Sequence, residues 1–137
     1  MSFDQAKLLE TALEIIGSVK CPSLTTLDGS GTPITRTIAA FPLDDDMTIW
    51  LGTSPNSRKA ANITADSRIT LNYWQPEGMS YVTVNGNAQL VNDPELKKKY
   101  WMEGWERWYP EPEKDYILIQ IKPESLEIFS FKHEVMG

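Results

Sequence analysis

Short runs of strand-forming residues, separated by turn formers, recur along the whole chain. Residues 23–27 and 33–41 flank a run of turn formers at 28–31, which is typical of a β-hairpin. Further strands are expected at residues 47–51, after a solvated turn at 44–46, and at 68–73, 80–91 and 116–121. A last strand is expected at 126–131, after a turn at Pro123. Six or seven strands with few helices favour a small β-barrel with peripheral helices over a doubly wound sheet. The 137 residues suit a single domain, 1–137, with a sizeable core.

Three helices are expected between the strands, over residues 2–17, 58–64 and 95–108. A capping box of Ser2 and Gln5 would begin the first helix. The pair Asp93-Pro94, a capping residue followed by a proline, would begin the third.

The strand at 80–91 is interrupted by Asn85-Gly86, which is a strong signal for a tight hairpin turn. A single long strand with a β-bulge at Gly86 would use the same two residues. The local sequence leaves both possibilities open.

Composition excludes several classes of site. One cysteine, Cys21, cannot form an intramolecular disulfide framework or a cysteine-based metal finger, and no metal site is expected. A Ser-His-Asp or Cys-His catalytic arrangement would depend on His133, the single histidine, close to the terminus. The formal net charge of -6 argues against binding to nucleic acid or a membrane surface. With no long apolar stretch and no signal-peptide pattern, a soluble cytoplasmic protein is expected.

One group of residues has the chemistry of an anion site. Ser57, Arg58 and Lys59 stand at the start of the expected helix 58–64, directly after Thr53 and Ser54, and Ser57 is expected to cap this helix. Free backbone N–H groups and the helix dipole favour an anion there, and two cations with three hydroxyls would strengthen the preference for a phosphate dianion. An exposed helix start with solvated cations would explain the same spacing.

Arg36 lies in the expected strand 33–41, and it joins this site only if its side chain points at the same anion. Trp101, Trp105 and Trp108 are spaced so that they would share one stripe of the expected third helix. Such a stripe is more often core or interface than a ligand platform, and it favours a homodimer.

Five motifs follow one another in the chain: LTTLD at 24–28, NSRKA at 56–60, RITL at 68–71, YVTVNGNA at 81–88 and WERWYP at 105–110. In this order and spacing they resemble the flavin-binding split-barrel proteins related to pyridoxamine 5'-phosphate oxidase, in particular the general-stress-protein branch. The resemblance extends over residues 24–129.

The resemblance implies a six-stranded antiparallel split β-barrel that forms a homodimer and binds two FMN molecules at the subunit interface. It favours the bulge at Gly86. The implied function is that of an oxidoreductase acting on a small-molecule substrate, with NAD(P)H as a possible reductant. Related split barrels use the deazaflavin F420, and a flavin-binding stress protein without turnover is a further alternative.

The resemblance also implies roles for the cations and hydroxyls. Arg58 and Lys59 would hold the FMN phosphate, assisted by Ser57 or Ser54 and by Arg36.

For the flavin ring, the resemblance implies that the backbone of Thr37 and Ile38, with Arg36, runs beside the isoalloxazine edge. Thr53 would reach the polar side of the ring. Trp108, or Trp105, from the partner chain would line the ring or the substrate pocket. No catalytic residue is assigned.

Two departures from the family pattern argue against oxidation of pyridoxamine phosphate. The vitamin-making oxidases carry a lysine where this chain has Phe41, and they end in an Arg-Leu-Pro-type tail, whereas residues 129–133 read FSFKH. The substrate cannot be identified from the sequence.

Overall fold

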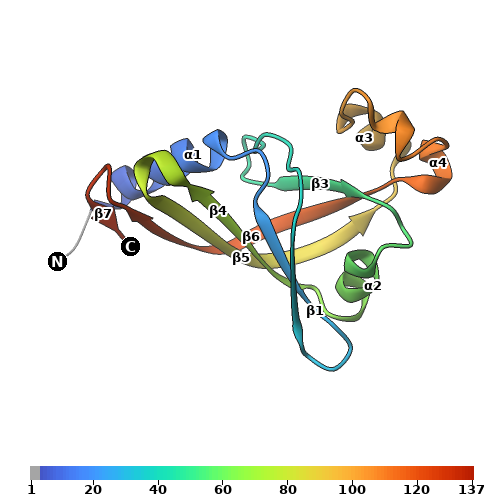
Figure 1. The fold of residues 1–137 in the computed structure, drawn as a ribbon, viewed down its shortest axis with the longest axis horizontal. Helices are drawn as coiled ribbons and strands as arrows, with labels where there is room; N and C mark the ends of the chain where they lie inside the picture. The colour runs from blue at the N-terminus through green and yellow to red at the C-terminus, as the bar shows by residue number, and fades with distance from the viewer. Residues whose placement is uncertain (1–3) are drawn as a thin grey trace.

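The computed structural model describes residues 4–137, and its strands form one antiparallel sheet that curls strongly into a half-barrel (Figure 1). The strands are β1 (Ser23–Leu27), β2 (Pro33–Thr37), β3 (Ile49–Thr53), β4 (Arg68–Gln75), β5 (Ser80–Val91), β6 (Ile117–Ser130) and β7 (Val135–Met136). Their order is β2-β1-β4-β5-β6-β3, and β7 pairs with β6. The mainly β architecture with few helices is the one that the strand pattern predicts.

The strand predicted at 33–41 is shorter in the structure, because β2 ends at Thr37. After β2 the chain stays hydrogen-bonded to the segment before β1, because the Ile38 N–H donates to the Pro22 carbonyl and the Ala40 N–H to the Lys20 carbonyl, both at 3.0 Å. It also reaches β3, at the other edge of the strand order. There Ala40 forms an isolated bridge with Leu51, and the Phe41 N–H donates to the Trp50 carbonyl at 3.1 Å. The segment after β2 therefore links the β2 edge of the sheet to the β3 edge.

The strand β5 is continuous, so the alternative hairpin is wrong. The pairing is irregular at Gly86, as predicted, because the register of β5 against β6 shifts between Asn85, opposite Ser125, and Gly86, opposite Pro123. The extra residue, however, is Glu124 of β6, so the bulge belongs to β6 and not to β5. A Cβ atom at Gly86 would collide with the Lys122 carbonyl, so only glycine fits this approach.

The two strands predicted at 116–121 and 126–131 are one strand, β6, and the turn predicted at Pro123 is wrong. Proline lacks the N–H needed for a regular ladder but is tolerated at an irregularity in the pairing. Pro123 lies at this register shift, which explains how the strand continues through it.

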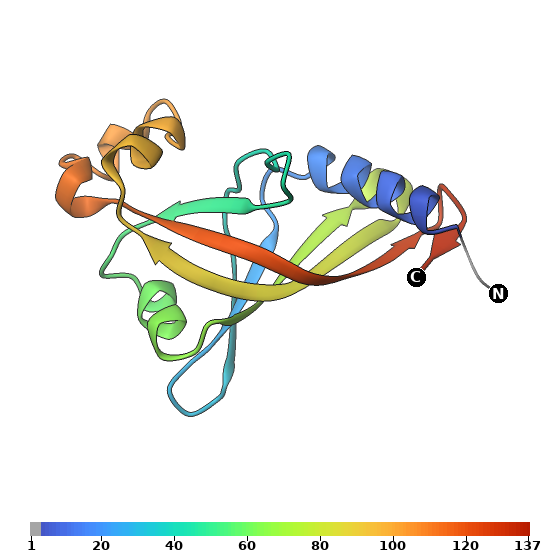
Figure 2. The same cartoon turned by 180° about the vertical axis from the view of Figure 1, so that it is seen from behind.

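The helices are α1 (Gln5–Ser18), α2 (Arg58–Ala65), α3 (Pro94–Lys99) and α4 (Pro112–Asp115), with 3-10 turns η1 (Pro76–Gly78) and η2 (Trp105–Arg107). The cap predicted at Ser2 lies outside the described residues, and the Asp4 carboxylate caps α1 by accepting from the Ala6 N–H. Helix α1 lies at one end of the sheet, and α3 and α4 lie at the other (Figure 2). Within the described part of the chain, no helix is both long and apolar enough to cross a membrane.

The helix predicted over 95–108 is wrong beyond Lys99. Helix α3 ends there, and Gly104 adopts a φ of +93°, a left-handed conformation that a continuing helix would not allow. The three tryptophans consequently do not share a helical stripe.

Two clusters of side chains make up the interior. The aliphatic core fills the inner face of the curled sheet and includes Leu24, Leu51, Leu71, Val82 and Ile119, with Ile15 of α1 packed against it. The aromatic cluster lies toward α3 and α4; its buried members are Trp50, Tyr100, Tyr116 and Leu118, and its partly buried members include Trp101, Trp105 and Tyr109.

Candidate functional site

The hydroxyl groups before α2 form a hydrogen-bonded turn. Ser57 caps the helix, and its Oγ accepts from the Ala60 N–H at 3.2 Å. Thr53, at the end of β3 and only 2% exposed, donates its hydroxyl to Ser57 Oγ at 3.2 Å. The Ser54 hydroxyl accepts from the Asn56 N–H at 3.1 Å. The cap predicted at Ser57 is confirmed, and these contacts connect β3 to the start of α2.

The side chain of Arg36 is fixed by contacts with β1 and with its own strand. Its Nη1 donates to Thr26 Oγ1 at 2.7 Å and to the Ile34 carbonyl at 3.0 Å. Thr26 also accepts from Asn62 Nδ2 of α2, at 2.8 Å. The half-buried guanidinium is thereby held on the side of β1 that α2 covers.

Three cations, Arg36, Arg58 and Lys59, lie near one another at the start of α2, and their charges lower the pKa of two of them. Burial, and then the charge of Arg58, lower the pKa of the Arg36 guanidinium. Burial, and then the charge of Arg36, lower the pKa of the Lys59 ammonium. Among residues 4–137 none of the three forms an ion pair. Hydrogen bonds from Thr32 and Ser30, and then the charge of Arg58, lower the pKa of the Asp28 carboxyl, so one carboxylate lies near the group without pairing with it. Positive charge gathered without an ion pair favours the binding of an anion.

A pocket of about 360 Å³ lies next to these cations. Its lining residues come from the segment after β2, the end of β3, the start of α2 and the aromatic loop: Thr37, Ile38, Ala39, Gly52, Thr53, Lys59, Trp105, Trp108 and Tyr109. The pocket thus combines a cation, a buried hydroxyl and aromatic rings. Such a combination can hold a planar polar molecule that carries an anionic group.

Gly52 and Tyr116 shape the wall of this pocket. A Cβ atom at position 52 would overlap the Tyr116 ring, so the strand needs glycine there. The Tyr116 hydroxyl donates to the Tyr100 carbonyl at 2.6 Å, and burial raises its pKa. A neutral, hydrogen-bonded tyrosine therefore packs against Gly52, which lines the pocket.

The residues predicted for the site fall into two groups. Those that line the pocket are Thr37, Ile38, Thr53, Lys59 and Trp108. Those that surround the α2 start without lining the pocket are Arg36, Ser54, Ser57 and Arg58. Trp108 reaches the pocket from the same chain, and its side chain is 71% exposed.

Sequence reasoning missed Gly52, Ala39 and Tyr109 as lining residues. A glycine inside a strand was the available signal at position 52, because it marks close approach by another group. No local signal pointed to Tyr109, since its position depends on the loop that replaces the predicted helix. Trp101 lines a different cavity.

Comparison with known proteins gives a family match over nearly the whole chain. The sequence profile described as "Pyridoxamine 5'-phosphate oxidase like" matches residues 7–136. General stress protein 26 of Bacillus subtilis (strain 168) is 30% identical over 131 residues, which cover 93% of this chain and 91% of that protein.

Solved structures show the same fold. A protein related to general stress protein 26 from Clostridium acetobutylicum superposes with a TM-score of 0.80 at 20% identity, covering 98% of this chain and 96% of the other. A pyridoxamine 5'-phosphate oxidase-related, FMN binding protein from Nostoc punctiforme PCC 73102 superposes with a TM-score of 0.70 at 16% identity, covering 99% and 90%.

Proposed function

Because this chain belongs to the pyridoxamine 5'-phosphate oxidase-like family, we propose that it is an FMN-binding flavoprotein and an oxidoreductase acting on a small organic molecule. The observation that carries the proposal is the group of three cations without a counter-ion beside the pocket at Thr53. The description of the Nostoc punctiforme relative as an FMN binding protein supports the choice of cofactor.

The residues at the start of α2 fit the phosphate of FMN. Arg58 and Lys59 supply charge-assisted hydrogen bonds, and Arg36 adds a third positive charge from β2. The start of α2 offers a phosphate the positive end of the helix dipole and the N–H groups before Ala60, whose own N–H donates to Ser57 Oγ. Ser57 and Ser54 add hydroxyl groups to the same turn.

The pocket fits the flavin ring. The backbone of Thr37 and Ile38 forms one edge, and Thr53 offers a buried hydroxyl on the opposite strand. Trp105 and Trp108 add aromatic rings to the lining. FMN supplies the redox chemistry when bound, while these residues bind and orient it.

The proposal includes a homodimer. Trp108 is exposed although it lines the pocket, and the outer residues of β2 are open to solvent in the isolated chain. A second copy that covers these surfaces would bury both and enclose the flavin. We expect FMN retention to depend on dimer formation, and a monomer that retains FMN would contradict the interface site.

The activity we propose differs from oxidation of pyridoxamine phosphate. Phe41 lies in edge-to-face contact with Tyr100 and Trp105, at 5.5 and 5.7 Å between ring centroids, so this position supplies packing and no charge. An oxidoreductase with another substrate, reduced by NAD(P)H, fits the site better.

The test is an absorbance scan of the protein purified without added cofactor, followed by mass spectrometry of the molecule that heat releases. A flavin spectrum and the mass of FMN would support the proposal. Release of F420 would mean that the cofactor is the deazaflavin and not FMN. Failure to bind added FMN would overturn the flavoprotein assignment. Oxidation of NADH or NADPH by the loaded protein would distinguish an oxidoreductase from a flavin-binding stress protein without turnover.

A further inference from the structure

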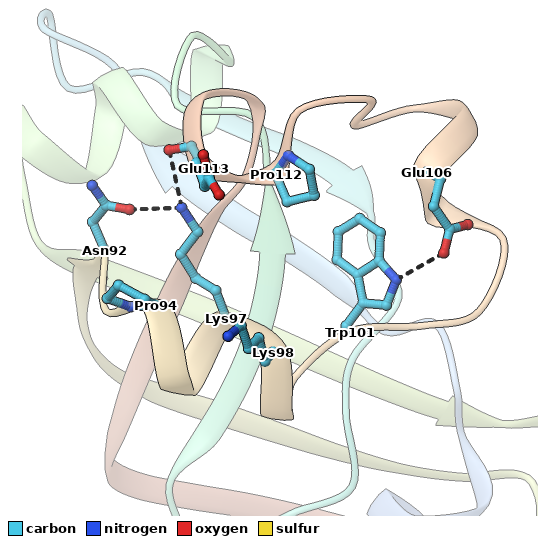
Figure 3. A pocket seen from close by; sticks show the side chains of 8 residues that line it. All are labelled: Asn92, Pro94, Lys97, Lys98, Trp101, Glu106, Pro112 and Glu113. Atoms are coloured by element: carbon cyan, nitrogen blue, oxygen red, sulfur yellow. Dashed lines mark hydrogen bonds between the residues drawn. The ribbon is translucent and has the colours of Figure 1, made fainter.

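A second and larger cavity, of about 680 Å³, lies between α3, η2 and α4 (Figure 3). It shares no lining residue with the pocket at Thr53. The turn η2 separates the two, because Glu106 of η2 lines the larger cavity whereas Trp105, its neighbour, lines the smaller one. The volume lies in the range of cavities that bind small organic molecules.

Lys97 is the unusual feature of this cavity, because its side chain is only 7% exposed. Its ammonium donates to Asn92 Oδ1 at 2.8 Å and to the Glu113 carbonyl at 3.3 Å (Figure 3). Both acceptors are neutral, and no carboxylate in the described part of the chain forms an ion pair with Lys97. An ammonium can donate three hydrogen bonds, so Lys97 can donate one more to a ligand in the cavity.

A buried charge without a counter-ion is costly, and an anion that binds beside it recovers part of that cost. The ammonium of Lys97 therefore favours a ligand that carries negative charge. The chain is acidic overall and Glu106 and Glu113 also border the cavity, so a monoanion suits it better than a phosphate dianion.

The other walls are flat and apolar. The indole ring of Trp101 forms one wall, held by a hydrogen bond of 3.3 Å from its Nε1 to Glu106, and the rings of Pro94 and Pro112 form others (Figure 3). Aromatic rings stack well on an indole, and proline rings offer rigid apolar contact. These walls favour a planar ring as the body of the ligand.

We propose that this cavity is a second binding site, separate from the flavin pocket, for a small aromatic carboxylate. The ring of the ligand lies against Trp101 and the carboxylate accepts from the ammonium of Lys97. The site requires no flavin and is independent of the proposed redox function.

The experiment compares two probes by isothermal titration calorimetry on the whole protein as purified: 2-naphthoate and its uncharged analogue 2-naphthylmethanol. We expect 2-naphthoate to bind roughly tenfold or more tightly than the alcohol, as one charge-assisted hydrogen bond allows. Lys97→Met should abolish this preference. Lys98→Met, which removes an exposed lysine of the same cavity, should keep it within about twofold. Equal binding of the two probes by the unaltered protein would overturn the proposal.

A spectroscopic readout locates the probe and remains decisive if Lys97→Met does not fold. In the unaltered protein, 2-naphthoate should shift the indole N–H resonance of Trp101, which is assigned by its loss in Trp101→Phe. A shift of the Trp108 resonance alone would mean binding at the flavin pocket and would overturn the second site. If 2-naphthoate bound only to the monomer and dimer formation displaced it, a second copy of the chain would occupy the cavity. That result would also overturn the proposal.

Discussion

The aliphatic core buries saturated side chains on the inner face of the sheet, whereas the aromatic cluster combines stacked rings with hydrogen bonds to distant residues. Leu24, Leu71 and Val82 in the core are fully buried and have no polar atoms in their side chains. In the aromatic cluster, Tyr100 donates to the Asp44 carboxylate at 2.8 Å, and Trp50 donates to the same carboxylate at 2.9 Å.

The two regions also differ in their relation to the cavities. The aromatic cluster supplies rings to both, through Trp101 on one side and Trp105 and Tyr109 on the other. Most residues of the aliphatic core contact neither. We infer that the core provides most of the stability, while the aromatic cluster defines the shape of the binding sites.

Leu71→Ala is expected to have the largest effect on stability. It leaves a cavity in the aliphatic core and should lower the free energy of unfolding by about 3 kcal/mol. Urea unfolding monitored by circular dichroism measures this. The affinity of the folded fraction for FMN should stay the same, and a large loss of affinity would contradict the division between the two regions.

Gly52→Ala tests the junction between β3 and the aromatic cluster. Its new methyl group would overlap Tyr116, so we expect the free energy of unfolding to fall by about 2 kcal/mol and FMN to bind more weakly. Gly17→Ala is the matched control, because nothing lies within 4 Å of its new methyl group and helix α1 would accept alanine. Similar behaviour of the two variants in calorimetric melting and FMN titration would refute the role of Gly52.

Alkaline pH tests the buried tyrosines. Burial, then the hydrogen bond to Asp44, raise the pKa of Tyr100 to about 12 from the ordinary value of 10.0. The folded state therefore holds a proton that the unfolded state loses, and stability is full below pH 10 and falls as the pH rises toward 12. One such group can lower the free energy of unfolding by at most about 1.4 kcal/mol per pH unit in this range.

The matched variant for this effect is Tyr100→Phe, which lacks the ionisable group. Its stability should decline less steeply than that of the unaltered protein between pH 10 and pH 12 in urea titrations. Parallel declines would show that Tyr100 does not contribute.

Tyr116→Phe is expected to have the smallest effect. It removes the hydrogen bond to the Tyr100 carbonyl and keeps the ring, so the free energy of unfolding should fall by about 1 kcal/mol. Thermal melting measures it, and Tyr81→Phe, on a partly exposed strand face, is the comparison that should leave the melting temperature nearly unchanged. An equal shift for both would mean that the hydrogen bond adds nothing.

Local sequence patterns predict the aliphatic core better than the aromatic cluster. The strands that form the core are predicted from short runs of strand-forming residues between turn formers, and the cap at Ser57 is predicted from its side chain and position. These are local patterns. The bulge at Gly86 was left open, because the pairing partner on β6 decides it.

The aromatic cluster was not predicted, because contacts distant in the sequence determine it. The hydrogen bond from Tyr100 to Asp44 joins residues 56 apart, and Asp44 belongs to a segment that reads as a solvated turn. Helix periodicity continues through 95–108, yet α3 ends at Lys99, where Tyr100 leaves the helical conformation. The left-handed Gly104 and the packing of Trp105 on Phe41 then keep the following segment from resuming the helix. The orientation of Arg36 likewise depends on Thr26, which no local pattern indicates.

We propose that Arg36, Arg58 and Lys59 together hold the phosphate of a flavin. The most direct measurement is the ratio of the dissociation constants of riboflavin, which lacks the phosphate, and FMN, by fluorescence titration of the unaltered protein and of Arg58→Ala/Lys59→Ala. We expect the unaltered protein to prefer FMN by roughly 100-fold and the double variant to lose most of that preference while still binding riboflavin. An equal ratio in the two proteins would contradict the claim.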